Sequence, residues 1–388
     1  MFLDKVLENN RKLVECAFDM HNSGMILPDT YILDFDTIEA NAAVMKKKAD
    51  ENDISLYFML KQIGRNPLVA KKLMDIGFSG AVAVDYKEAL CMIDNDIHIS
   101  NVGHLVQIPD AVLDRIISHQ PDYVTVYSYD KILKINEIAS KHNIVQKLLI
   151  RLSDEDSLLY AGQEAGFHSD ELGNLIDKIS KLENVEAGGF TVFPALLFDE
   201  KEKKIMPTVN MKAMNRGIEI AVEKGLDNLN VNLPSATCCA SLDLIKELGG
   251  TSGEPGHGLT GTTPLHKFTN QIEKVGYVYV SEISHTYNGN SYCYGGGHYR
   301  RGHMENVLVG KSFKEAQKFK VLPLSDEVID YHFTIEGELT PGECAILAYR
   351  TQVFTTRSNV AVVKGIQNDE PELLGLYNSL GQKIERNW

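Results

Sequence analysis

Between residues 31 and 248 the chain alternates short runs of apolar and β-branched residues with longer segments of helical periodicity. This alternation is typical of parallel sheets, because two neighbouring parallel strands need a crossover long enough to hold a helix. About eight such units over roughly 230 residues have the size and rhythm of a (β/α)8 TIM-type barrel. A doubly wound open sheet has the same rhythm, and periodicity does not separate the two folds. The expected strands are 31–35, 54–60, 80–84, 97–102, 123–127, 147–152, 187–192 and 229–233.

The rhythm changes after about Leu265. Strand-like runs then follow one another without long helices, and turn-forming residues separate them at 287–290 and 340–343. We therefore expect an α/β barrel domain over residues 25–265 and a mostly β domain over 266–388, with residues 1–24 joining the β domain. The expected strands of the β domain are 275–280, 306–309, 319–322, 345–349 and 360–363.

The composition excludes several classes of protein. The 388 residues are 44% hydrophobic and 24% charged, an ordinary globular composition. The formal net charge of −14 argues against a nucleic-acid or anionic-membrane partner. The six cysteines show neither C-x-x-C pairs nor a disulfide framework, and neither a signal peptide nor a membrane-spanning run is visible. We expect a soluble, cytoplasmic, reduced protein.

Lys61 ends the apolar run 54–60 and is followed by the loop 62–67. In a barrel, active residues lie at the carboxyl ends of the strands. Burial there disfavours the charged ammonium, and a neutral lysine amine can form a Schiff base with pyridoxal 5′-phosphate. Most lysines after a strand are simply solvated, so the partner residues decide between the two interpretations.

Two later segments are candidates for an anion site. Ser235 follows the strand 229–233 and precedes a helix, where it is either a phosphate ligand or an N-cap. The loop 253–263 holds four glycines and three threonines, so its backbone amides can converge on an anion. The alternative for this loop is a plain linker to the β domain.

With these residues in view, the chain resembles the fold-type III pyridoxal-phosphate enzymes, the alanine racemase and ornithine/diaminopimelate decarboxylase superfamily. It is particularly similar to a branch of predicted amino-acid racemases. Residues 57–61 correspond to the strand-ending Schiff-base lysine, and 78–90 to the segment that follows it. Residues 234–236 correspond to a phosphate-binding Asn-Ser-Ala, and 254–256 to the start of Glu-Pro-Gly-Arg. The similarity covers about 31 to 357.

The resemblance implies pyridoxal 5′-phosphate as the cofactor. Lys61 would bind it and Glu254 would meet its pyridine nitrogen. Phe354 would take the place of a ring-contacting tyrosine. The chain departs from the pattern at His257, where the motif has arginine, and at Val192 or Phe193, where the superfamily stacks a histidine on the ring. The residues that would hold the phosphate are Ser235, Gly256, His257, Gly258 and Thr260.

The resemblance further implies chemistry at the Cα of an amino acid. A carboxylate at the pyridine nitrogen keeps the ring protonated, so proton abstraction and return would pass through a quinonoid intermediate. Racemisation needs a base on each face: Lys61 is one, and Tyr294 or Cys293 from the neighbouring subunit of a homodimer is the other. Tyr294 is favoured because Gly295 follows it, as in racemases. The alternative is that both residues only pack in a core.

The substrate carboxylate would meet an arginine, and the candidates are Arg151, Arg300 and Arg301. No metal is expected, since the spacing of His285, Cys293, His298 and His303 fits no standard zinc pattern. An amino-acid racemase is thus the predicted function. An amino-acid decarboxylase is the alternative, followed by a non-catalytic cofactor carrier and a zinc-assisted D-amino-acid lyase.

Overall fold

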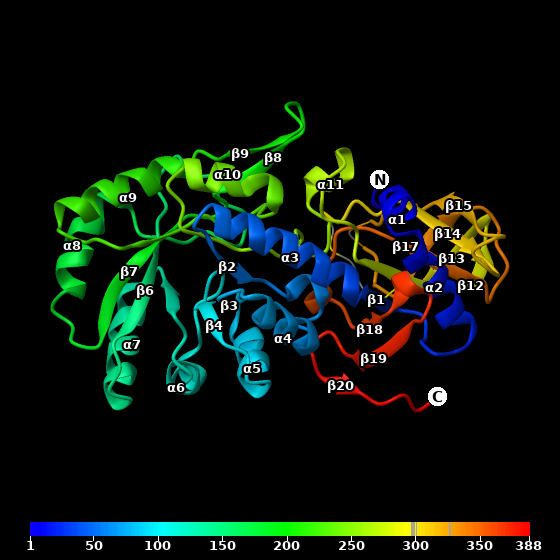
Figure 1. Cartoon of the computed structure of the whole chain (residues 1–388), viewed down its shortest axis with the longest axis horizontal. Helices are drawn as coiled ribbons and strands as arrows, with labels where there is room; N and C mark the ends of the chain where they lie inside the picture. Colours follow the sequence, from blue (N-terminus) through cyan, green and yellow to red (C-terminus); the bar gives the residue numbers. More distant parts are fainter. Residues whose placement is uncertain (296–298, 300, 326) are drawn as a thin grey trace. The chain divides into compact units, whose positions relative to one another are not determined.

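The computed structural model describes residues 1–295, 299, 301–325 and 327–388. They form two compact units (Figure 1). The barrel unit consists of Met45–Met59 and Ala70–Gly256, and the sheet unit of Met1–Val44, Leu60–Val69 and His257–Trp388. Both units are discontinuous in sequence, whereas the two expected domain cores, 25–265 and 266–388, are continuous.

The barrel unit is built on a closed ring of eight parallel strands, in the order β10-β11-β2-β3-β4-β5-β6-β7. Ring closure confirms the TIM-type barrel and excludes the open sheet. Tyr57, Met59, Val82 and Val84 of the barrel unit form a buried hydrophobic cluster. The strands are β2 (Ser55–Phe58), β3 (Gly80–Ala83), β4 (Ile99–Val102), β5 (Tyr123–Val126), β6 (Gln146–Arg151), β7 (Val185–Thr191), β10 (Asn230–Asn232) and β11 (Ser252–Gly253).

Several of the helices between these strands begin at side-chain caps. The side chain of Asp85 accepts the N–H of Glu88 at the start of α5, and Ser128 accepts that of Lys131 at the start of α7. A hairpin precedes α9. α3 (Phe35–Glu51) precedes β2 and runs from the sheet unit into the barrel unit. The elements that follow are α4 (Pro67–Ile76), α5 (Tyr86–Asp94), α6 (Asp110–Ser118), α7 (Tyr129–Lys141), α8 (Ser169–Ile179), β8 (Leu196–Asp199), β9 (Lys204–Pro207), α9 (Met211–Glu223) and α10 (Cys239–Glu247).

The sheet unit holds a ten-stranded sheet, with α1 and α2 in its hydrophobic core. This confirms the mostly β C-terminal domain. Among the described residues, no helix is long and apolar enough to cross a membrane. The elements are α1 (Phe2–Asn9), α2 (Arg11–Asn22), β1 (Thr30–Asp34), η1 (Lys61–Ile63), α11 (Pro264–Phe268), β12 (Tyr277–Tyr287), β13 (Asn290–Tyr294), β14 (Asn306–Gly310), β15 (Gln317–Lys320), β16 (His332–Glu336), β17 (Cys344–Leu347), η2 (Val353–Thr355), β18 (Asn359–Lys364), η3 (Ile366–Asn368), β19 (Glu372–Tyr377) and β20 (Lys383–Ile384).

One strand lies in a different sheet from the expected one. β1 was expected to open the barrel but pairs antiparallel with β12 and parallel with β18, so that Ile32 lies between Val278 and Ala361. All five residues of β1 are buried, and a run of buried residues predicts a strand without specifying its partners. The eighth barrel strand is instead β11, which has two residues and no apolar run, and so it left no signal in the sequence.

Candidate active site

Lys61 stands at the start of η1, shortly after the end of β2. The turn behind it is tightly held, because the backbone N–H of Arg65 donates to the carbonyl of Leu60 at 2.9 Å. Gly64 has φ +72°, and a Cβ there would come within 2.9 Å of a methyl group of Val360. The backbone that carries the amine is therefore fixed by both conformation and packing.

Glu254 follows β11 directly in the barrel unit. β11 pairs in parallel with β2, and the N–H of Met59 donates to the carbonyl of Pro255 at 2.9 Å. The carboxyl ends of these two strands are therefore adjacent, and Glu254 lies there with 4% of its surface exposed. One carboxylate oxygen accepts a hydrogen bond from Asn101 Nδ2 at 3.3 Å, and the other lies 3.6 Å from His104 Nε2. This is a buried carboxylate with one oxygen hydrogen-bonded to Asn101 and the other facing the imidazole of His104.

Ser235 occupies a strained turn after β10. Its φ is +83° and that of Ala236 is +53°, a region that non-glycine residues rarely adopt. The helix α10 is capped by Cys238, which exchanges hydrogen bonds with Ser241, so the interpretation of Ser235 as the N-cap is wrong. The positive φ values therefore occur at residues that are not glycine and that do not cap the helix. Backbone strain of this kind is frequent at binding sites.

A cluster of basic groups lies in the sheet unit around His257. Its Nδ1 is 3.3 Å from Thr262 Oγ1, which is 2.8 Å from Thr260 Oγ1. Its Nε2 is buried without a hydrogen-bond partner among the described residues. Burial first, and then the positive charges of Arg350 and Lys61, hold the pKa of His257 well below its ordinary value. An anion would offset this repulsion and accept from Nε2.

Arg350 in this cluster is missing from the predicted site residues. The sequence did contain a reason to look for another arginine. His257 replaces the arginine of the Glu-Pro-Gly-Arg motif, so the expected phosphate site lacks that positive charge. Phe354, which the prediction chose in the same segment, lies under the guanidinium of Arg65, 5.3 Å from its ring centroid. Arg65 is itself only 2% exposed. Phe354 therefore packs against the turn that follows Lys61.

Arg151 ends β6 and is 1% exposed. Its Nη2 donates to the carbonyl of Gln163 at 2.8 Å, whereas Nε and Nη1 are buried without hydrogen-bond partners within the described part of the chain. Burial lowers the pKa of this guanidinium. A buried cation with two unused donors at the carboxyl end of a barrel strand fits an anionic ligand.

Tyr294 and Cys293 are adjacent on β13 but differ in environment. Tyr294 is 39% exposed, and its carbonyl accepts from Ser281 Oγ at 2.6 Å. Cys293 is fully buried, and burial raises the pKa of its thiol to about 12. At Gly295 a Cβ would lie 2.9 Å from the Phe333 ring, so the chain passes over that ring only because the residue is glycine.

The other arginine and metal candidates are partly outside the described residues. Arg300 and His298 are among those left undescribed. Arg301 is exposed, and the Tyr299 ring lies 5.5 Å from its guanidinium and 5.8 Å from that of Arg350. His285 stacks on Tyr292, and the described residues contain no group of three His, Cys, Asp or Glu side chains that could hold a metal ion.

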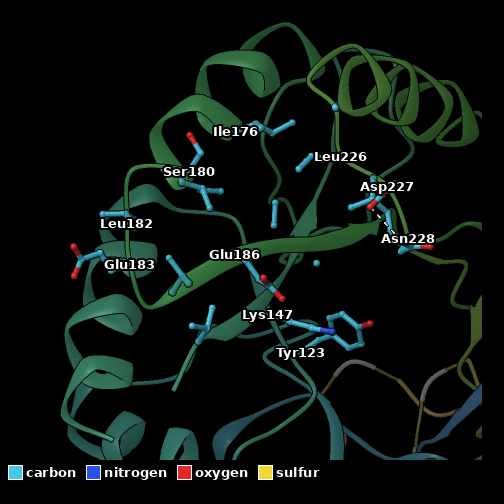
Figure 2. Close-up of a pocket in the computed structure, with 17 residues that line it drawn as sticks. Tyr123, Lys147, Ile176, Ser180, Leu182, Glu183, Glu186, Leu226, Asp227 and Asn228 are labelled. Carbon is cyan, nitrogen blue, oxygen red and sulfur yellow. Dashed lines mark hydrogen bonds between the residues drawn. The ribbon is translucent and has the colours of Figure 1, made fainter. Parts of the chain in front are cut away.

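A cavity of about 550 Å³ lies at the amino-terminal end of the barrel strands, opposite the end that carries Glu254 and Arg151. Figure 2 shows Tyr123 and Lys147, from the starts of β5 and β6, facing the loop with Asp227 and Asn228. None of the predicted site residues lines it. Glu254 and Arg151, the buried charged residues described above for the barrel unit, lie instead at the carboxyl ends of the strands, where active residues of this fold are expected.

Residues 33–264 match the model of the alanine racemase N-terminal domain, about three-fifths of the chain. The chain belongs to this family. Residues 278–373 match the YhfX-like C-terminal domain. Over 387 residues the chain is 39% identical to the uncharacterized protein YhfX of Escherichia coli K12, covering 99% of this chain and 100% of that one.

Solved structures of the same fold carry several activities in their names. The D-threonine aldolase from Filomicrobium marinum has a TM-score of 0.66 at 15% identity and covers 91% of this chain and 95% of its own. An alanine racemase from Clostridium difficile 630 has a TM-score of 0.65 at 18% identity, and the match covers 90% of this chain and 98% of that one. A diaminopimelate decarboxylase from Helicobacter pylori has a TM-score of 0.61 at 12% identity, and the match covers 92% of this chain and 94% of that one. At such identities the likeness shows the fold alone.

Pyridoxal 5′-phosphate is the cofactor of this family, and the residues present fit it. In the sheet unit, the unpartnered His257 Nε2 and its basic neighbours call for an anion such as phosphate. In the barrel unit, the buried carboxylate of Glu254 suits a protonated ring nitrogen. Lys61 is the candidate for the amine that would meet the aldehyde.

Proposed function

We propose that this protein is a pyridoxal-phosphate-dependent amino-acid racemase, which removes the proton from Cα and returns it on either face. The contrast between Tyr294 and Cys293 carries the choice of reaction. Racemases of the superfamily present a tyrosine followed by glycine in this segment, and decarboxylases present a cysteine. Here the tyrosine is 39% exposed and the cysteine is buried with its thiol protonated. Tyr294 is therefore the group of the two that is able to reach a substrate.

Lys61 and Glu254 prepare the substrate for this reaction. Lys61 would hold the cofactor through its amine, and its Nζ would take or give the Cα proton. Glu254 holds its negative charge toward the pyridine nitrogen. The bound cofactor withdraws electrons from Cα and thereby makes its proton removable.

Tyr294 is the base for the opposite face, acting through its phenol oxygen in the site of the partner subunit of a homodimer. Two bases on opposite faces are the minimum for racemisation, since one base returns the proton to the face it left. The hydrogen bond from Ser281 to the Tyr294 carbonyl, and the close passage of Gly295 over Phe333, hold this segment in place.

The remaining site residues bind anionic groups. Ser235, Gly256, His257, Gly258 and Thr260 hold the phosphate, with Arg350 adding charge. Arg151 would bind an anionic oxygen of either the cofactor or the substrate, because its Nε and Nη1 have no acceptor within the described residues. Arg301, and Arg300 beside it in sequence, are proposed for the substrate carboxylate.

An amino-acid decarboxylase is the second candidate, favoured by Glu254. A carboxylate at the ring nitrogen is the choice of the decarboxylases, whereas alanine racemases use arginine there. The buried position of Glu254 at the end of β11 supports this role as much as it supports racemisation. The two reactions differ in what leaves Cα, which makes them separable by experiment.

The test begins with cofactor capture and continues with isotope exchange. Purified protein is mixed with pyridoxal 5′-phosphate, reduced with borohydride and digested, and Lys61→Ala serves as the control. Single-enantiomer amino acids are then screened in D2O by proton NMR and chiral chromatography. Deuterium at Cα with loss of optical purity supports the racemase. Carbon dioxide release with one deuteron retained would instead establish a decarboxylase.

Three further outcomes would contradict the proposal. Retro-aldol cleavage of a β-hydroxy amino acid would establish a lyase. A cofactor trapped on Lys61 without exchange of any Cα proton would identify a carrier. Failure of wild-type protein to take up the cofactor would overturn the whole assignment.

A further inference from the structure

A buried hydrogen-bonded network surrounds Glu254 inside the barrel unit. Thr125 Oγ1 on β5 donates to Asn101 Oδ1 on β4 at 2.8 Å, and Asn101 Nδ2 donates to Glu254 Oε1 at 3.3 Å. His104 Nε2 lies 3.6 Å from Glu254 Oε2. Thr125, Asn101 and His104 are fully buried, and Glu254 is 4% exposed. Each carboxylate oxygen therefore faces a separate polar group at the end of β4.

The backbone and the rings around His104 determine its direction. Gly103 has φ +83°, and its N–H donates to the carbonyl of Ala83 on the neighbouring strand at 3.0 Å. A Cβ at Gly103 would lie 3.3 Å from the carbonyl of Thr125, so this turn requires glycine. The Phe193 ring packs edge-on against the imidazole, with ring centroids 5.1 Å apart. His104 is thus held toward Glu254 from two sides.

A buried carboxylate is costly unless it is hydrogen-bonded or paired. Asn101 Nδ2 donates to Oε1 of this carboxylate. The distance of 3.6 Å to His104 is longer than a hydrogen bond and within the range of an ion pair, and such contacts tighten when a ligand binds. The superfamily places a histidine near position 193, where this chain has Val192 and Phe193. In this chain, a phenylalanine at that place supports a histidine that comes from β4.

We propose that His104 is a positioning residue that keeps Glu254 ionised and aimed at the pyridine nitrogen of the cofactor. This inference rests on the proposed role of Glu254. His104 touches neither substrate nor the reacting Cα; it acts through the carboxylate. Its loss would remove the imidazole that faces Oε2, and the proton shared by carboxylate and ring would move away from the ring nitrogen.

The experiment loads wild-type and variant proteins with 15N-labelled pyridoxal 5′-phosphate. The 15N chemical shift of the ring separates a protonated from a neutral pyridine without any turnover, and a fluorescence titration gives cofactor affinity. Glu254→Gln is the reference for a ring without its carboxylate. His104→Phe keeps a ring against Phe193 but removes the nitrogen, and His104→Gln restores a donor. Circular dichroism checks that each variant is folded.

We expect a protonated ring in the wild type and a neutral one in E254Q. H104F should move the shift toward the neutral value and weaken cofactor binding about tenfold, the size expected for a lost hydrogen bond to a charged group. H104Q should stay close to wild type. The double variant H104F/E254Q should equal E254Q alone, because both changes act through one carboxylate.

Each other result has a distinct meaning. A shift and affinity unchanged in folded H104F, or additive effects in the double variant, would overturn the role of His104 while leaving Glu254 in place. An unchanged ring in E254Q would remove Glu254 from the site, and this inference with it. If H104F does not fold, the 15N shifts of Asn101→Ala and H104Q are compared with that of E254Q instead. An H104Q shift equal to that of E254Q would then contradict the proposal.

Discussion

Cys293 and Tyr294 are consecutive residues of β13, and the first is fully buried whereas the second is 39% exposed. Neighbouring side chains of a strand point to opposite faces, so a difference of one position decides between core and surface. Tyr294 pairs with His332 across the strands and its ring lies 5.7 Å from that imidazole. A one-residue change of register would exchange the two roles.

The first prediction separates these neighbours. Tyr294→Phe should lower racemisation at least about 100-fold, because it removes a proton-transfer group. Cys293→Ala should keep racemisation within a few-fold and lower the free energy of unfolding by about 1 kcal/mol. Chiral chromatography and urea unfolding measure the two effects. Loss of activity in C293A with an active Y294F would reverse the assignment.

The second prediction concerns the phosphate. Arg350→Met should weaken the binding of pyridoxal 5′-phosphate about tenfold, as expected for a lost charge-assisted contact. Arg301→Met is the matched control, since both guanidinium groups lie near the Tyr299 ring. Fluorescence titration, with inorganic phosphate as competitor, gives both affinities. Equal affinities for R350M and wild type would exclude Arg350 from the phosphate site.

The third prediction is a pH dependence of stability. The pKa of His257 in the folded protein lies well below 6.5, so the unfolded chain takes up this proton first as the pH falls. The free energy of unfolding should therefore decrease below pH 6.5, by at most about 1.4 kcal/mol per pH unit for this group. His257→Gln should remove that part of the slope in urea titrations between about pH 5 and 8. An identical slope in both proteins would disprove the assignment.

The fourth prediction isolates the crowding behind Lys61. Gly64 and Gly249 have similar φ values, +72° and +77°, but a Cβ at Gly64 meets Val360 at 2.9 Å and one at Gly249 meets nothing within 4 Å. Gly249→Ala should cost about 1 kcal/mol for its backbone conformation alone. Gly64→Ala should cost about 1–3 kcal/mol more from overpacking. Equal losses by chemical denaturation would show that the turn has room to adjust.

Much of the fold could be predicted from the sequence because its strands are short apolar runs with polar surroundings. The pattern predicted seven of the barrel strands at nearly their observed positions, including β2 and β7. It did not predict β11, since Ser252 and Gly253 have neither apolar nor β-branched character. It placed β1 in the wrong sheet, because the choice between barrel and sheet depends on partners far away in sequence.

The candidate site was predictable where a motif carries the chemistry. Lys61 stands just after β2, a strand that the pattern located, whereas Glu254 and His257 were found through the glycine-rich loop and its Glu-Pro-Gly motif. Arg350 and His104 were not predicted, because each derives its importance from a neighbour that is remote in sequence: His257 for the first and Glu254 for the second. Only the folded chain brings these pairs together.

The pairing of β1 with β18 has a consequence for synthesis of the chain. Thr30 pairs with Asn359, so β1 gains this parallel neighbour only after more than 320 further residues have been synthesised. The strands of the barrel all precede Glu254, which allows that ring to close earlier. A nascent chain stopped before Asn359 would leave one edge of β1 with open hydrogen-bonding groups, a state prone to association with other chains. Both edges of β1 are therefore paired only once β18 has been synthesised.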